Sequence, residues 1–206
     1  MIVDIPADGV SLEGELLVPE GATGLVLFAH GSGSSRHSRR NNFVADRVRE
    51  RGVATLLFDS LTEAEDETYE TRFDVSLLTD RLLAAREWVR RQEELEGLSI
   101  GYFGSSTGSA AALRGATRGS DVGAVVSRGG RVDLASDVLE HVRVPTLFIV
   151  GEADRQVLEL NREAYERVPG VKRLEVIDRA GHHFEEPGAL ETVADHAGTW
   201  FVDHLG

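Results

Sequence analysis

The chain of 206 residues has no cysteine and a single lysine, Lys172. The lack of cysteine excludes disulfides, thiolate zinc sites, iron-sulfur clusters and a cysteine nucleophile. No apolar run approaches the length that spans a bilayer, and the N-terminus lacks the basic and apolar halves of a signal peptide. We therefore expect a cytoplasmic protein that has no membrane partner.

Positive charge is scarce, with 22 Lys and Arg against 35 Asp and Glu and a net charge of −13. Such a balance argues strongly against nucleic acid as a partner, because binding to phosphates requires basic surface. The length favours one domain over residues 1–206, and a chain of this size can bury about 70% of its surface in a core.

Short apolar runs separated by helical patterns predict an α/β fold with a mostly parallel sheet and helices on both faces. Two further runs at the N-terminus, 2–5 and 12–18, flank Ala7-Asp8-Gly9 and predict an antiparallel hairpin on the sheet edge. The sequence thus predicts eight strands. The six parallel candidates are residues 25–29, 53–58, 100–103, 122–126, 146–150 and 174–177.

Helical periodicity is clearest over residues 78–89 and 190–201, where apolar side chains form a stripe. Pro187 suits the first turn of the second helix. The acidic stretch 62–72 is interpreted as a solvated loop. Because strands and helices use the whole length, no inserted cap domain is expected and the pocket should be shallow and open.

The stretch Gly104-Ser105-Ser106-Thr107-Gly108 follows a predicted strand and opens a run of small residues. This strand-turn-helix pattern is typical of a nucleophile elbow, in which a strained turn exposes a serine. Glycines two residues before and after the serine are needed because side chains there would collide with neighbouring backbone. Ser106 is therefore the candidate nucleophile.

A serine nucleophile needs a base and an acid that orients the base. On this architecture they follow in the order Ser, Asp, His at strand ends, which selects Asp154 and His182. Two alternatives remain open, because Asp133 follows the preceding strand and His183 is adjacent to His182.

The loop 30–35 leaves another strand and is rich in small residues, so it can bring backbone N–H groups to a substrate oxygen. We expect the oxyanion donors to be the amides of Ser32, or Gly33 in its place, and Thr107. Arg36 follows this loop, in a cluster with Arg39 and Arg40, and Arg128 lies at another strand end with Arg131 nearby. Arg36 and Arg128 either pair with the protein's own carboxylates or hold an anionic group of the substrate, such as a carboxylate or phosphate.

These blocks, together with 127–131 and 182–188, resemble the α/β-hydrolase superfamily and its small dienelactone-hydrolase-like group over nearly the whole chain. The resemblance implies an α/β-hydrolase fold and a serine hydrolase acting on a small carboxylic ester or lactone. It implies Ser106 as nucleophile, Asp154 as acid, His182 as base, and the Ser32 and Thr107 amides as oxyanion hole. The enzyme that gives the group its name uses cysteine, so its dienelactone substrate is not carried over.

Neither a metal nor an organic cofactor is expected for this chemistry. Two other functions stay open. One is a transacylase or perhydrolase that uses the same triad with another acceptor, and the other is a non-catalytic module that binds a small anion in the same pocket.

Overall fold

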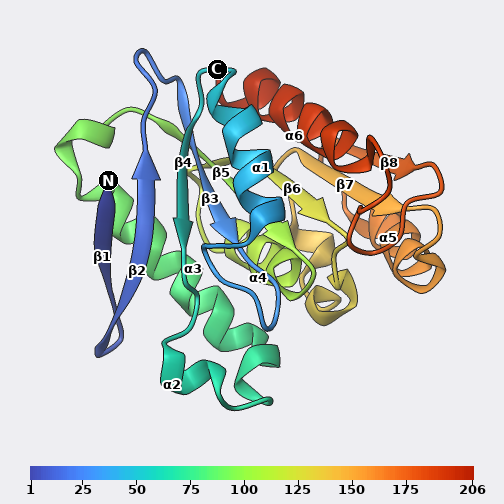
Figure 1. Cartoon of the computed structure of the whole chain (residues 1–206), viewed down its shortest axis with the longest axis horizontal. Coiled ribbons are helices and arrows are strands. Elements are labelled where there is room, and N and C mark those ends of the chain that lie inside the picture. The colour runs from blue at the N-terminus through green and yellow to red at the C-terminus, as the bar shows by residue number, and fades with distance from the viewer.

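The structure is a computed structural model that describes all residues from Met1 to Gly206. Eight strands form one sheet with helices on both sides (Figure 1). The elements in chain order are β1 Ile2–Ala7, β2 Val10–Leu17, β3 Gly24–Ala29, α1 Arg39–Arg49, β4 Ala54–Phe58, α2 Glu63–Asp66, η1 Thr71–Phe73, α3 Val75–Arg90, η2 Glu93–Leu95, β5 Ser99–Ser105, α4 Thr107–Ala116, β6 Val122–Arg128, η3 Val132–Ala135, η4 Leu139–His141, β7 Thr146–Gly151, α5 Arg155–Arg167, β8 Lys172–Ile177 and α6 Ala189–Leu205.

The strand order is β1-β2-β4-β3-β5-β6-β7-β8. Strands β3 to β8 are parallel, whereas β1 pairs with β2, and β2 with β4, in antiparallel fashion. Asp8 (φ 44°) and Gly9 (φ 81°) form the tight turn between β1 and β2, because a two-residue hairpin of this type needs positive φ at both positions. The predicted eight-stranded α/β-hydrolase sheet with its antiparallel N-terminal edge is confirmed.

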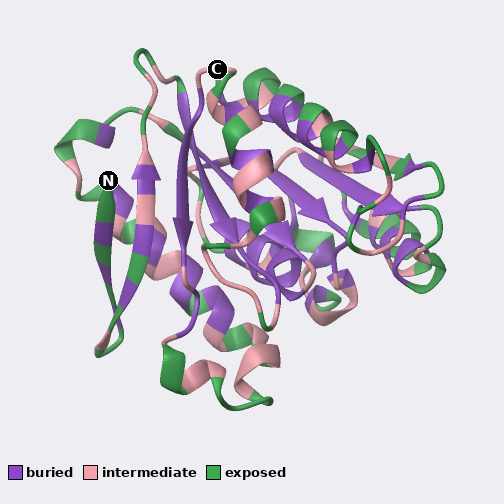
Figure 2. Ribbon diagram, viewed as in Figure 1, coloured by how far each residue is buried: buried purple, intermediate pink, exposed green.

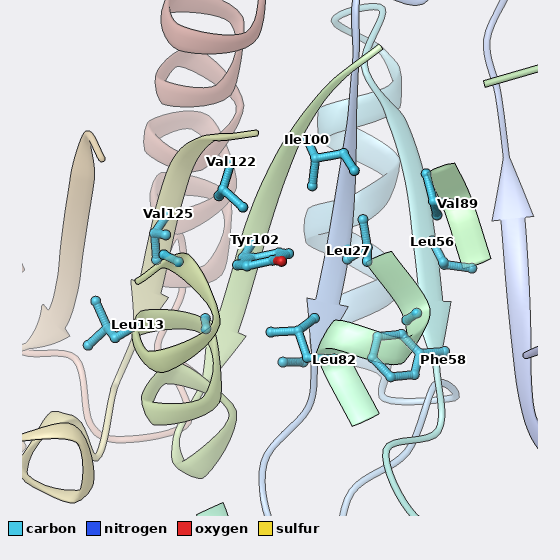
Figure 3. Close-up of a cluster of buried hydrophobic side chains, with 14 of the residues drawn as sticks. Leu27, Leu56, Phe58, Leu82, Val89, Ile100, Tyr102, Leu113, Val122 and Val125 are labelled. Atoms are coloured by element: carbon cyan, nitrogen blue, oxygen red, sulfur yellow. The ribbon is translucent and has the colours of Figure 1, made fainter. Parts of the chain in front are cut away.

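Two layers of helices enclose the sheet. Helices α1 and α6 cover one face, and α3, α4 and α5 cover the other. Figure 2 shows that the central strands are buried along their length, and every residue of β3 and β4 is buried. Figure 3 shows the core on the α3 and α4 side, where Leu82 and Leu113 pack with Leu27 and Tyr102 of the sheet. Burial of both faces holds the carboxyl ends of the parallel strands at one rim.

The start of the last helix differs from the sequence-based prediction. Pro187 lies outside α6, which begins at Ala189 after Gly188 with φ 80°, so proline precedes the helix rather than opening it. The connection from β6 to β7 contains only the short turns η3 and η4, which confirms the absence of a cap domain. None of the helices combines the length and apolar composition that crossing a bilayer requires.

The acidic stretch 62–72 is solvated as expected, with none of its residues buried, but it is partly helical rather than a loop throughout. Thr62 and Glu65 form a capping box that starts α2. Glu65 also accepts a hydrogen bond at 2.7 Å from Arg81, a buried residue that donates to the Ala7 carbonyl as well. One carboxylate of the stretch is therefore the counterion of a buried guanidinium and fixes the segment against α3 and β1.

Replacing Glu65 with alanine is expected to lower the free energy of unfolding by about 3 kcal/mol, because Arg81 loses its counterion while it stays buried. The matched control is Glu67→Ala. Glu67 is exposed and forms no ion pair, so its loss should change the free energy by less than about 0.5 kcal/mol. Urea unfolding followed by circular dichroism measures both, and equal effects of the two substitutions would contradict the role of Glu65.

Candidate active site

Ser106 lies in the turn between β5 and α4 with φ 51° and ψ −119°. A non-glycine residue in such a conformation costs about 1 to 3 kcal/mol and persists only where its surroundings hold it. Here the Ser106 N–H donates to the Arg128 carbonyl at 3.1 Å, and the Ser106 carbonyl accepts the Arg131 N–H at 3.0 Å. The hydroxyl is half-buried and has no hydrogen-bond partner in the protein, so it is presented at the rim of the sheet.

The two glycines of the elbow, Gly104 and Gly108, lie so close to neighbouring backbone that neither position has room for a side chain. A Cβ on Gly104 would lie 2.5 Å from the Cα of Ser109, and a Cβ on Gly108 would overlap the carbonyl of Ala29. Both contacts are with backbone, which cannot move aside. Glycine is therefore the one residue that fits on either side of the serine in this turn.

Asp154 and His182 are brought together from the ends of β7 and β8. Asp154 precedes α5, and its Oδ2 lies 2.6 Å from His182 Nδ1, with the carboxylate largely buried and the imidazole half-buried. A carboxylate can only accept, so Nδ1 carries the proton and the lone pair lies on Nε2. Nε2 has no partner in the protein and is the atom available as a base.

Ser106 and His182 flank the same turn after β6. Arg128 receives the Ser106 N–H, and a Cβ on the next residue, Gly129, would lie 3.4 Å from His182 Nδ1. On the other side of the serine, a Cβ on Gly31 would lie 3.8 Å from Ser106 Oγ. The absence of side chains at these two glycines leaves the approach to the hydroxyl open.

The two alternative residues are arranged differently. His183 is exposed, and its ring lies edge-on against that of His182 with 5.2 Å between centroids. Partial burial and the nearby charge of Arg40 lower its pKa. Asp133 accepts two hydrogen bonds from the guanidinium of Arg131, at 2.9 and 2.8 Å, and these lower the pKa of Asp133. Neither His183 nor Asp133 takes part in the Asp154 and His182 pair.

The predicted oxyanion residues lie side by side, in an arrangement that the sequence did not indicate. The Ser32 N–H donates to the Thr107 hydroxyl at 2.9 Å. Thr107 is the first residue of α4, so its own N–H has no partner within the helix. His30 fixes the loop, since its Nε2 accepts the Ser60 N–H at 2.9 Å and its Nδ1–H therefore donates to the Gly31 carbonyl. Burial lowers the pKa of His30 and favours this neutral form.

Arg36 and Arg128 have opposite surroundings. Arg36 forms ion pairs with Asp59 at 2.8 Å and Glu13 at 2.6 Å, as expected if it serves the protein's own carboxylates. Arg128 is buried and forms no ion pair. Of the predicted substrate-binding pair, the structure leaves only Arg128 free to bind an anion.

Two further residues shape the site and were not selected from the sequence. Glu186 Oε1 accepts the Gly181 N–H at 3.0 Å and so holds the loop that carries His182. Arg40, in the first turn of α1, adds a positive charge near His183. The cluster of arginines after the loop 30–35 was a signal for Arg40, but the pattern gave no means of choosing among them.

A cleft of about 580 Å³ opens beside the oxyanion loop, beyond the ends of β3 and β4. Its lining includes His30, Arg36 and the carboxylates Asp59, Glu63 and Asp66. The cleft therefore lies on one side of Ser106 along the sheet, and Arg128 at the end of β6 lies on the other.

Several known proteins resemble the chain over nearly its whole length. A structure of a dienelactone hydrolase from Anabaena variabilis matches with a TM-score of 0.98 and 49% identity, covering 100% of this chain and 98% of the other. Est1E from Butyrivibrio proteoclasticus, also solved with ferulic acid bound, matches with a TM-score of 0.83 over 98% of both chains at 16% identity, a likeness that shows the fold alone.

A Mycobacterium tuberculosis protein that bears the name "Putative phosphoribosyl transferase" is 51% identical over 204 residues. The match covers 98% of this chain and 46% of the mycobacterial protein, so the chain spans about half the length of this curated relative. The profile of the dienelactone hydrolase family matches residues 45–197, which include the elbow, Asp154 and His182. Together with the structural match, this shows that the chain belongs to the dienelactone hydrolase family.

Proposed function

We propose that the chain is a serine hydrolase that cleaves a carboxylic ester or lactone of a small substrate through an acyl-enzyme on Ser106. The proposal is carried by the short Asp154 to His182 hydrogen bond, in a site where the turn after β6 binds the N–H of Ser106, held at positive φ, and packs against the His182 ring. Est1E, which shares the fold, binds ferulic acid, and small carboxylic esters are therefore the class to test first.

In the first step His182 Nε2 takes the Ser106 proton as Oγ attacks the ester carbonyl carbon. Asp154 keeps the imidazole in the required tautomer and stabilises its protonated form. The alcohol oxygen then leaves with the proton from His182, and water, deprotonated by the same nitrogen, attacks the acyl-enzyme. The acid is released and the Ser106 hydroxyl is restored, so no other reactant is consumed.

The tetrahedral oxyanion would be stabilised by the amides of Thr107 and Ser32. Each donor of this kind typically contributes about 3 to 4 kcal/mol to the transition state. The Ser32 N–H is bonded to the Thr107 hydroxyl, so it has to be shared with the oxyanion or released when the hydroxyl rotates.

A fluorophosphonate probe tests the activation of Ser106 without knowledge of the substrate. We expect one probe per chain in the intact mass, and no label in the Ser106→Ala variant. Ser105→Ala is the matched control and should label normally, because Ser105 is a buried residue of β5. A well-folded protein that takes no label would contradict the proposal and favour a module that binds a small anion.

A transacylase or perhydrolase would use the same residues and differ only in the nucleophile that attacks the acyl-enzyme. The name of the mycobacterial relative points to phosphoribosyl transfer, but this chain matches under half of that protein. An acyl-enzyme on a serine is not a step in moving a phosphoribosyl group, so we do not assign that activity to the residues described above.

A further inference from the structure

Arg128 is a buried cation that the protein does not compensate. It is 8% exposed, its guanidinium forms no hydrogen bond or ion pair with any other residue, and Nη1 is sealed from solvent. Its Cζ lies 5.9 Å from the ring centroid of Phe103, a contact that uses none of its donors. Arg81 provides the comparison, because it is equally buried yet donates to Glu65 and Ala7.

An unpaired buried charge is costly, and the rest of the chain avoids the cost for Arg81. Burial and the charge of Arg40 lower the pKa of Arg128 to about 9, which leaves the guanidinium charged at neutral pH. The protein carries an excess of 13 negative charges, yet places none of its carboxylates against this residue. A counterion for Arg128 would therefore have to come from outside the chain.

Arg40 supplies a second guanidinium at the same place. Its Nε is buried without a partner, and its Nη1 lies 3.7 Å from the exposed Glu185, which is too long for a hydrogen bond. Burial and the nearby charges of Arg40 and Arg128 lower the pKa of His183 and favour its neutral form, so the two guanidinium groups form a positive cluster beside that imidazole. The two arginines come from α1 and β6, which the fold brings together across the rim.

The backbone at Arg128 adjoins both the nucleophile and the base. The Arg128 carbonyl accepts the Ser106 N–H at 3.1 Å, and the following Gly129 packs against the His182 ring. The opposite side of Ser106 carries Asp59, Glu63 and Asp66, and the one arginine of that cleft, Arg36, is already paired with Asp59 and Glu13, so the cleft offers no free cation to an anion. A substrate that carries both an ester and an anion is thus oriented with its anion toward β6.

We propose that Arg128 and Arg40 form a subsite for a phosphate monoester group on the substrate of Ser106, an inference that rests on the proposed function. The two guanidinium groups have no firm counterion and together carry two positive charges. A phosphate dianion neutralises both, whereas a carboxylate would neutralise only one of them. A phosphate group also has three oxygens that can accept hydrogen bonds from two guanidinium groups, whereas a single guanidinium already occupies both oxygens of a carboxylate.

Binding is tested first, in the inactive Ser106→Ala protein, with inorganic phosphate as the probe. At pH 7.5 and constant ionic strength, phosphate at ten times its Kd should raise the Tm by about 3 to 6 °C. Arg128→Met in the same background should abolish the shift. Arg39→Met is the matched control and should retain it, because Arg39 is the exposed neighbour of Arg40 and has no ion pair. A shift that survives Arg128→Met overturns the subsite.

Selectivity is tested next with three p-nitrophenyl esters, of pentanoic acid, glutaric acid and γ-phosphonooxybutyric acid. We expect Arg128→Met to lower kcat/KM about 100-fold for the phosphate-bearing ester and less than 3-fold for the neutral one. An equal loss on the carboxylate ester overturns the choice of phosphate, and an equal loss on the neutral ester shows a structural role for Arg128.

The two experiments separate the subsite from the proposed function. If no ester is hydrolysed but phosphate still shifts the Tm of the Ser106→Ala protein through Arg128, the hydrolase proposal fails and the anion site stands. If esters are hydrolysed and phosphate causes no shift, the anion site fails and the hydrolase proposal stands.

Discussion

Replacing His182 with alanine is expected to lower kcat for ester hydrolysis by about 10⁶-fold. In a Ser-His-Asp triad, removal of the base alone costs about as much of the rate as removal of all three residues. The serine then keeps its proton, and the leaving alcohol has no acid. The substitution should leave the fold intact, since the imidazole is half-buried and its one hydrogen bond is to Asp154. Steady-state hydrolysis of a p-nitrophenyl ester measures the loss.

The neighbouring residue supplies the control. His183 is exposed and forms no hydrogen bond with a carboxylate, so His183→Ala should keep kcat within about 3-fold of the unmodified protein. The pair of variants differs only in which of two adjacent histidines is removed. If the large loss followed His183→Ala instead, the assignment of the base would be wrong despite the Asp154 contact.

Replacing Asp154 with asparagine is expected to lower kcat by about 10⁴-fold, because an amide can donate to Nδ1 and so favours the tautomer whose Nε2 carries the proton. The size and position of the side chain hardly change, which separates this effect from a packing defect. The same ester assay provides the rate, and thermal unfolding confirms that the variant is folded.

Asp133→Asn is the matched control for that substitution. Its carboxylate is bound at both oxygens by Arg131, at 2.9 and 2.8 Å, and does not contact His182. The loss of this half-exposed pair should cost no more than about 1 kcal/mol of stability and leave kcat within a factor of about 3. A large loss of activity in Asp133→Asn with normal activity in Asp154→Asn would transfer the acid role to Asp133.

The features that could be predicted from the sequence are those that depend on local periodicity and on the spacing of residues along the chain. Six parallel strands follow from short apolar runs, because a strand buried on both faces must be apolar throughout. The elbow follows from Gly104 and Gly108, whose missing side chains are forced by contacts with Ser109 and Ala29. The order of Ser106, Asp154 and His182 along the chain then places them at the ends of β5, β7 and β8.

The features that could not be predicted from the sequence depend on contacts between segments that are distant along the chain. In the sequence Arg36 and Arg128 are both arginines near the predicted site, and only the folded chain shows that Arg36 pairs with Asp59 while Arg128 has no counterion. Glu65 likewise reads as one of several solvated acids until α3 brings Arg81 against it. Charge pairing of this kind has no periodicity, so a single sequence carries no signal of which partner is chosen.

The strand that leads to His182 is the least buried of the parallel set. β8 ends the sheet, pairs with β7 alone, and buries only Ile177 among its residues. Segments with few buried contacts open at a lower free energy than the core. We therefore expect the loop that carries His182 to open at a lower free energy than the elbow that carries Ser106. If the proposed activity holds, its loss on warming or in denaturant should precede loss of the fold, because the opened state keeps its sheet but no longer positions His182.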